Sequence, residues 1–340
     1  MLFFSIGLPS RFAEWCDLIV RCLVETVIGE AELISANTLA ELGLAAIKSH
    51  RDHLVIAARQ PAEDLRQALM ELQYPFIVAL DAPYVALENL VSRHGVDVLG
   101  ATRVTANSCA AMMAYCVTPG ANILYASEQS ENPVAVAHSI SKCFGFDLSM
   151  DDLAQIVASV PEIVATEPLD QSEEVPTGAL AGYVDQLYGG GQLGSLRWGR
   201  ELFYLGDDPT RTADEVISLA GPIRNLLFGP YIVLPFGHWA MVVNFAISKE
   251  ALGTEFGIEV IAGRQCIRLA YVTTSPGREG ISRVPLTFTV DHTTEQPISL
   301  RIANLQPRVR GLFAMVDVSL NTQTINDTAI PAGISSALGL

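Results

Sequence analysis

The sequence of 340 residues predicts two domains in series: an α/β domain with a doubly wound, mostly parallel sheet, and an all-β domain with an antiparallel, jelly-roll-like sandwich. Three observations predict this fold class. Short apolar runs alternate with helical spacing in the first half, an acidic segment rich in Pro and Gly follows, and strand-like runs separated by turn signals fill the rest. We therefore place the α/β domain at 1–160, a linker at 161–196, the sandwich at 197–322 and a tail at 323–340.

The first domain is predicted from apolar runs that alternate with amphipathic segments. Strands are expected at Leu2–Ile6, Glu32–Ser35, His53–Ala57, Phe76–Leu80 and Asn122–Tyr125. Helices are expected at 12–28, 38–49, 61–73, 83–93, 96–115, 132–144 and 149–158. This alternation is typical of a parallel sheet with helices on both faces.

The linker is acidic and contains PEIVATEPLDQSEEVPTG and the glycine run of YGGGQLG. Its periodicity is weak, and one short helix is expected at 179–187.

The second domain is predicted from strands at Asn225–Leu234, Trp239–Ile247, Gly257–Ala262, Gln265–Val272, Leu286–Val290, Ile298–Ile302 and Leu312–Leu320. This spacing favours an antiparallel sandwich or jelly roll. The densest stretch, LLFGPYIVLPFGHWAMVVNFAIS, is predicted to be a hairpin that enters the sandwich core, with Trp239, Met241, Val243 and Phe245 on one face.

Composition and charge exclude several classes of protein and of binding partner. Half of the residues are hydrophobic, yet no apolar run reaches the roughly 18 residues of a membrane span. No basic region precedes the first apolar run, so we expect no signal peptide and a soluble product made in the cytoplasm, with export or assembly into a particle left open. Residues 1–196 hold nine Lys and Arg against 24 Asp and Glu, whereas residues 197–320 hold 12 of each. Nucleic acid is therefore not an expected partner.

The opening MLFFSIGLPSRFAEW has the strand, tight loop and helix of a phosphate-binding unit, but it lacks Gly-x-x-x-x-Gly-Lys-Ser/Thr. It resembles the sulfotransferase family, whose first loop reads Pro-Lys-Ser-Gly-Thr-Thr-Trp, because Pro9 and Trp15 have that spacing. FIVALDAPYVALENLV resembles the family segment around Arg-Asp-Pro, with Pro83 in register. YASEQSENPVAVAHSISKCFGFDLSMDDL resembles the segment after the last core strand. The resemblance covers residues 1–158 and implies a P-loop-like α/β fold.

The same resemblance places a nucleotide sulfate donor at a loop whose residues depart from the family pattern. Ser10 stands at the lysine position, Phe12 at the glycine position, and Ala13 and Glu14 at the threonine positions; Arg11 lies one position beyond the lysine. Phe12 obstructs close approach of a phosphate, and the carboxylate of Glu14 repels it.

The family's second phosphate contact is also changed. In register with Pro83, Asp81 replaces the arginine and Asn89 the serine that grip the 3′-phosphate. One such charge contact near 4 Å is worth roughly 4 kcal/mol at an effective dielectric of about 20, so a reversed charge opposes tight donor binding. Gly7, Pro9, Ser10, Arg11, Asp81 and Asn89 thus form a degenerate cofactor site, and we expect no cofactor.

Other interpretations of these residues stay open. Gly7 to Ser10 also make the turn that any such fold needs, with Ser10 as a helix N-cap, or the loop has been adapted to another ligand. A sulfotransferase-like base would be His50 or His53. A positively charged cleft formed by Arg11, Arg59 and Arg103 would contradict loss of the donor site.

The second domain is similar in general terms to β-sandwich modules that accompany polysaccharide-processing domains in bacteria. Aromatic rings stack on sugars in such modules. The candidates are Trp198, Tyr204, Tyr231, Phe236 and Trp239, with Trp198 and Phe236 expected to be the exposed pair and the core as the alternative for Trp239 and Tyr231.

The acidic stretch LGDDPTRTADE offers Asp207, Asp208 and Asp214 as weak candidates for a calcium site.

We therefore expect a noncatalytic, sulfotransferase-like protein with a glycan-linked binding or structural role, in surface polysaccharide biology. The alternative is a divergent sulfotransferase that transfers sulfate from 3′-phosphoadenosine 5′-phosphosulfate to a saccharide. A third possibility is an assembly protein, so the expected partner is a carbohydrate or another protein, and an oligomer is left open.

Overall fold

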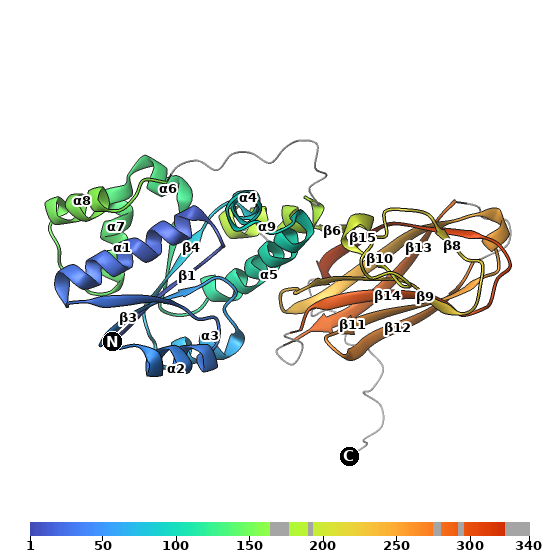
Figure 1. The fold of residues 1–340 in the computed structure, drawn as a ribbon, viewed down its shortest axis with the longest axis horizontal. Coiled ribbons are helices and arrows are strands. Elements are labelled where there is room, and N and C mark those ends of the chain that lie inside the picture. The colour runs from blue at the N-terminus through green and yellow to red at the C-terminus, as the bar shows by residue number, and fades with distance from the viewer. Residues whose placement is uncertain (164–176, 190–192, 275–279, 292–295, 324–340) are drawn as a thin grey trace, which may run out of the picture.

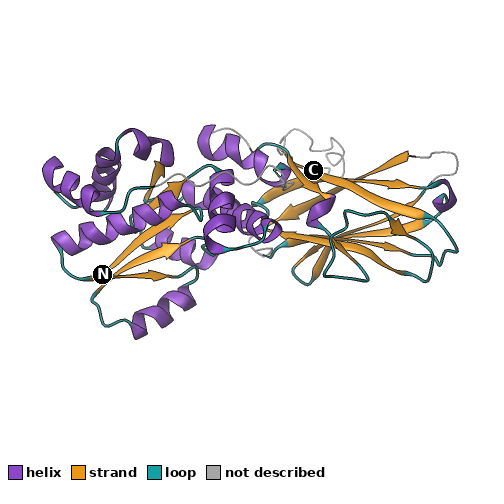
Figure 2. Ribbon diagram, turned by 45° about the horizontal axis from the view of Figure 1, so that its top comes forward, coloured by secondary structure: helices purple, strands orange, loops and turns teal. Residues whose placement is uncertain are grey.

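A computed structural model describes residues 1–163, 177–189, 193–274, 280–291 and 296–323. The α/β domain and the sandwich lie end to end along the long axis of the molecule (Figure 1). Most helices belong to the first domain, and the second is built almost entirely of strands (Figure 2). The predicted combination of an α/β domain and an all-β domain is confirmed. Within the described residues, no helix is long and apolar enough to cross a membrane.

The first domain is built on one parallel sheet, sheet A, in the order β2-β3-β1-β4-β5. Its strands are β1 (Leu2–Gly7), β2 (Ala31–Ser35), β3 (His53–Ala58), β4 (Phe76–Leu80) and β5 (Ala121–Tyr125). Successive side chains of these strands point to opposite faces, so Phe3 joins one buried cluster and Phe4 the other. The predicted parallel sheet with helices on both faces is therefore confirmed.

One face of sheet A is covered by α1 (Arg11–Val27), α7 (Pro133–Cys143) and α8 (Met150–Ser159). The other is covered by α2 (Leu39–Lys48), α3 (Glu63–Glu71), α4 (Pro83–His94), α5 (Val98–Cys116) and α9 (Gly178–Gly189). The short helix α6 (Ala126–Glu131) continues directly from β5 and was not predicted. The helix expected in the linker is α9, and the remaining linker residues 164–176 and 190–192 lie outside the described residues.

The second domain is a sandwich of two sheets. In sheet B the order is β13-β10-β15-β6, with β8 paired to β15, and in sheet C it is β12-β11-β14-β9-β7. The strands of sheet B are β6 (Leu196–Gly199), β8 (Ile217–Ser218), β10 (Gly237–Ile247), β13 (Gly280–Val290) and β15 (Leu312–Gln323). Those of sheet C are β7 (Tyr204–Leu205), β9 (Arg224–Ile232), β11 (Glu255–Ala262), β12 (Gln265–Thr273) and β14 (Ile298–Asn304). The described pairings within both sheets are antiparallel.

The predicted hairpin between β9 and β10 is wrong. β10 pairs with β13 and β15 in sheet B, whereas β9 pairs with β14 and β7 in sheet C. The turn between them carries the chain from one sheet to the other. The alternating buried face of Trp239, Met241, Val243 and Phe245 is as expected, because alternation identifies the inward face of a strand and says nothing of its neighbour.

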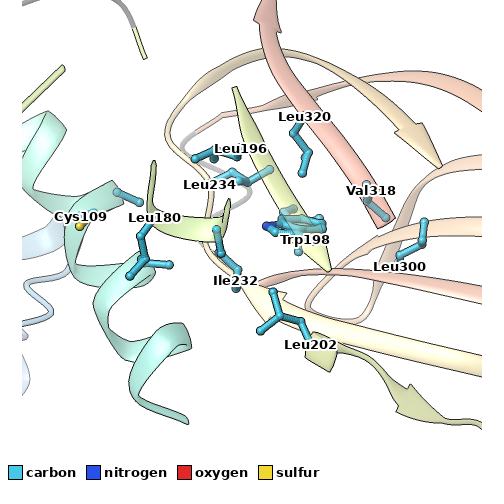
Figure 3. Packing of buried hydrophobic residues seen from close by; sticks show 14 of the residues in the cluster. Cys109, Leu180, Leu196, Trp198, Leu202, Ile232, Leu234, Leu300, Val318 and Leu320 are labelled. Carbon is cyan, nitrogen blue, oxygen red and sulfur yellow. The ribbon is translucent and has the colours of Figure 1, made fainter. Parts of the chain in front are cut away.

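The two domains share one continuous apolar core. Cys109 of α5 and Leu180 of α9 lie close to Ile232 and Leu234 of the sandwich, beside the fully buried Trp198 (Figure 3). Gly182 permits close packing of α9, since a Cβ there would meet the carbonyl oxygen of Gly194 at 2.6 Å.

Polar contacts reinforce this junction. Arg103 of α5 donates to the carbonyl oxygens of Pro230 at 2.7 Å and Leu202 at 3.1 Å, and to the hydroxyl of Tyr204 at 2.7 Å. Asn107, one turn further along α5, accepts from the backbone N–H of Val233 at 2.8 Å. The α/β domain and the sandwich therefore meet through hydrogen bonds as well as apolar packing.

Candidate functional site

The loop from Gly7 to Ser10 lies at the carboxyl edge of sheet A, where β1 is flanked by β3 and β4. This is the end of the strands at which ligands bind in open α/β sheets. Gly7 ends β1 in a place where a Cβ would lie 2.7 Å from the carbonyl oxygen of Ala79. Ser10 then caps α1, because its Oγ accepts from the backbone N–H of Ala13 at 3.3 Å. The loop is therefore a tight turn closed by its own N-cap.

The side chains at the positions of the family's phosphate contacts are buried inside the fold. Phe12 and Ser10 are both buried, and the Phe12 ring stacks on Trp15 with centroids 6.3 Å apart. Asn89 of α4 is fully buried and donates to the carbonyl oxygen of Pro9 at 3.1 Å. Asn89 thus holds the loop in place.

Two carboxylates, those of Asp81 and Glu14, lie at this edge of the sheet. Asp81, just after β4, is buried and accepts from the backbone N–H of Ala82 at 2.8 Å. Burial raises the pKa of Asp81, while hydrogen bonds from Ala82 and Ser10 oppose that rise. Glu14, in the first turn of α1, is in an ion pair with Arg93 at 2.6 Å. The Glu14 carboxylate is thus partly neutralised by an ion pair, whereas that of Asp81 is held by a backbone hydrogen bond.

The raised pKa of Asp81 predicts a pH dependence of stability. Between the ordinary and the raised pKa the folded state binds more protons than the unfolded state, so stability falls as pH rises through this window. We expect the free energy of unfolding of Asp81→Asn to rise relative to that of the wild type as pH increases above the ordinary pKa of Asp, because Asn does not titrate. Urea unfolding at a series of pH values measures this difference. Asp52→Asn at an exposed carboxylate is the control, and parallel profiles for Asp81→Asn and the wild type would contradict the prediction.

Helix α9 brings the ring of Tyr188 to the same edge. The ring of Tyr188 lies 5.5 Å from that of Tyr125, the last residue of β5. Tyr183, one turn and a half earlier in α9, is fully buried. Burial raises the pKa of both α9 tyrosines, and the charge of Asp81 adds to the rise for Tyr188. The end of β5 is therefore packed against α9 through these two rings.

Arg59 and Arg103, two of the arginines expected at a positively charged cleft, lie in different parts of the structure. Arg59, just after β3, forms an ion pair with the buried Asp17 of α1, whose other carboxylate oxygen accepts from Ser5 at 2.5 Å. Arg103 is held at the domain junction. Of the three expected to form a positive cleft, two are therefore engaged in separate structural contacts.

Both histidines proposed as bases lie away from the loop. His53 begins β3 at the amino edge of sheet A, and about 16 Å of strand separates it from the carboxyl edge. His50 lines a surface cavity near the same amino edge with Arg21, Lys48 and Arg51. Neither residue shares an edge of the sheet with Ser10 and Asp81.

The aromatic candidates of the sandwich divide into buried and exposed groups. Trp198 and Trp239 are fully buried. The expectation that Trp198 is exposed is wrong, because β6 is part of sheet B and turns this ring into the core. Tyr231 and Phe236 are 42% and 43% exposed. Tyr204 is partly covered by Arg103, whose guanidinium carbon lies 4.8 Å from the ring centroid.

Phe236 also lines a cavity of about 560 Å³ between the domains. Ala110, Ala114 and Tyr115 of α5 form its opposite wall.

An aromatic residue that the sequence analysis missed is more exposed than the others. Tyr271 of β12 is 65% exposed, and Leu269, two residues before it on the same face, is 42% exposed. The sequence QCIRLAYVT predicts a strand whose successive side chains point to opposite faces, but it does not say which face of β12 is turned to solvent.

The acidic stretch does not assemble a calcium site. Asp208 accepts from the hydroxyl of Thr210 at 2.6 Å, which lowers the pKa of Asp208, and Asp207 lies 4.0 Å from Arg224. Across the described part of the chain, no three His, Cys, Asp or Glu side chains are placed to hold a metal ion.

Comparisons with known proteins find similarity only to solved structures. No protein-family model and no curated protein matches the sequence. Mouse sulfotransferase SULT7A1 complexed with PAP is 13% identical over 47% of this chain and 64% of that chain, with a TM-score of 0.37.

Two carbohydrate-binding modules are also similar. TmCBM61 in complex with β-1,4-galactotriose is 12% identical over 38% of this chain and 88% of the module, with a TM-score of 0.26. The C-terminal CBM6 of LamC from Zobellia galactanivorans is 13% identical over 38% of this chain and the whole of that module, with a TM-score of 0.26.

The chain spans about 64% of the length of the sulfotransferase.

Proposed function

We propose that this protein is a noncatalytic binding protein with a role linked to glycans. The α/β domain is a scaffold that has lost the capacity to bind a nucleotide sulfate donor, and the sandwich carries the binding surface. The observation that carries this proposal is the closed carboxyl edge of sheet A.

Three features of that edge support loss of the donor site. Ser10 is engaged as the N-cap of α1, and Phe12 fills the place of a loop glycine. Asp81 puts a carboxylate where the donor's phosphate needs a cation. Tyr188 of α9 packs on Tyr125 at the end of β5. A phosphate entering this edge meets the Asp81 carboxylate and side chains that are already packed.

A thermal-shift titration with adenosine 3′,5′-bisphosphate, the spent donor, tests the scaffold role. We expect no saturable change in melting temperature. A ligand that binds only the folded state would add about 2.7 kcal/mol of apparent stability at 100 times its dissociation constant, so binding would be evident.

Arg11→Ala is the matched variant for this titration. A saturable shift in the wild type that is lost in Arg11→Ala would overturn the noncatalytic proposal and support the divergent sulfotransferase. A shift of equal size in both proteins would indicate binding away from the loop and leave the closed edge in place.

The glycan-linked role is supported by the surface of the second domain. Tyr231 and Tyr271 are the exposed tyrosines of sheet C, and rings of this kind present an apolar face to the C–H groups of a sugar. Residues 197–320 carry no net charge, so this half of the chain suits a neutral partner.

A further inference from the structure

Strand pairing in sheet C places five side chains in one row across the sheet. Leu269 of β12 is opposite Glu259, Glu259 is opposite Arg301, Arg301 is opposite Phe228, and Phe228 is opposite Tyr204. The residues next to them on β11 and β14 are buried in the core between the sheets. Because side chains alternate along a strand, these five lie on the outer face of sheet C. We call them the cross-strand row.

Apolar side chains flank both ends of the cross-strand row. At the β12 end, Tyr271 lies two residues from Leu269 and therefore on the same face. At the other end, the ring of Tyr231 meets that of Phe228 edge to face, with centroids 6.2 Å apart, and Phe228 lies 5.8 Å from the ring of Tyr204. Two ring surfaces thus stand at opposite ends of the row.

The middle of the row is polar but electrically balanced. Arg301 donates to Glu259 at 3.2 Å, and their side chains are 46% and 34% exposed. Together they present hydrogen-bond donors and acceptors to a molecule lying over them, and their charges cancel. A ligand with many hydroxyl groups and no charge matches this pair.

The dimensions of the row also fit an extended ligand. Neighbouring strands lie about 4.8 Å apart, so the four strands from β12 to β9, which carry the rings at the two ends, span about 14 Å. We propose that the cross-strand row binds a neutral oligosaccharide that lies across the strands. The chain of sugars stacks on Tyr271 at one end and on Phe228 and Tyr231 at the other, with its hydroxyls on Glu259 and Arg301. This inference rests on the proposed glycan-linked function and assigns its binding surface.

Affinity electrophoresis of the full chain tests the assignment. The gels contain soluble neutral polysaccharides, namely β-1,3-glucan, β-1,4-galactan and hydroxyethyl cellulose, or acidic alginate. We expect at least one neutral polysaccharide to retard the wild type, and we expect Tyr271→Ala and Arg301→Ala each to weaken that retardation about tenfold in apparent affinity. Phe236→Ala is the control, because it removes an exposed ring that is not part of the row. Circular dichroism of each variant establishes that it is folded.

Each other outcome overturns the assignment. Retardation by no neutral polysaccharide, or by alginate alone, contradicts a neutral saccharide ligand. Retardation that persists in Tyr271→Ala and Arg301→Ala, or that is lost in Phe236→Ala, places binding elsewhere. The titration with adenosine 3′,5′-bisphosphate reports separately on the α/β domain, so failure of the cross-strand row is distinguishable from failure of the noncatalytic proposal.

Discussion

Asp17→Ala is expected to lower the free energy of unfolding by about 3 kcal/mol. Asp17 is buried in α1 and holds both Arg59 and Ser5. Its loss leaves the guanidinium of Arg59, which is only one-fifth exposed, without its partner. Breaking a buried pair from one side costs far more than losing a surface pair, because the remaining charge stays out of water. Urea unfolding followed by circular dichroism measures the change.

Two variants control this experiment. Arg21→Ala removes an exposed ion pair with Glu25 and is expected to cost less than about 1 kcal/mol. The double variant Asp17→Ala with Arg59→Ala is expected to be more stable than Asp17→Ala, since it no longer contains the uncompensated charge. A loss below about 1 kcal/mol for Asp17→Ala would show that the pair contributes little to this domain.

Trp198→Ala is expected to destabilise the protein by about 3–5 kcal/mol. The ring is fully buried beside Ile232, Leu300 and Val318, where sheet B meets sheet C near the domain junction (Figure 3). Alanine leaves a cavity that this packed core cannot fill. Thermal and urea unfolding measure the change.

Trp198→Phe is the conservative control. It keeps most of the ring volume and removes an indole N–H that has no hydrogen-bond partner within the described structure. We therefore expect Trp198→Phe to lower the free energy of unfolding less than Trp198→Ala does. Phe236→Ala, at an exposed ring, is expected to change stability by only about 0.5 kcal/mol. Equal losses for Trp198→Ala and Phe236→Ala would contradict the buried position of Trp198.

Much of the fold was predictable because its signals are local. Alternating runs such as Trp239 to Phe245 place apolar side chains on one face of a strand whatever the neighbouring strand is. The turn at Gly7 to Ser10 was likewise predictable, because a turn glycine and an N-cap serine depend on the conformation of the neighbouring backbone. The charge at Asp81, where the resembling family has a cation, is a property of the sequence itself.

The candidate sites depended on contacts between distant residues. The sequence predicts a hairpin of β9 and β10, yet their partners lie 33 or more residues further along the chain or in β7, and alternation does not specify them. Trp198 was expected to be exposed because it lies next to the linker in the sequence. Pairing of its strand, β6, with β15 instead places the ring in the core. Tyr271 and Arg301 become members of one surface only through the register of sheet C.

By itself, the sequence determined the alternation of strands and helices, the change to an all-β second half, and the charge and bulk that replace phosphate contacts in the first loop. Only the tertiary structure decided that Tyr188 of α9 packs against the end of β5, that Arg103 is held at the domain junction, and that Tyr271, Glu259 and Arg301 share one face. The physical reason is the distance along the chain over which each kind of interaction acts. Periodicity and turn chemistry act over a few residues, whereas sheet register and domain packing are set by the burial of apolar surface between segments far apart in the chain.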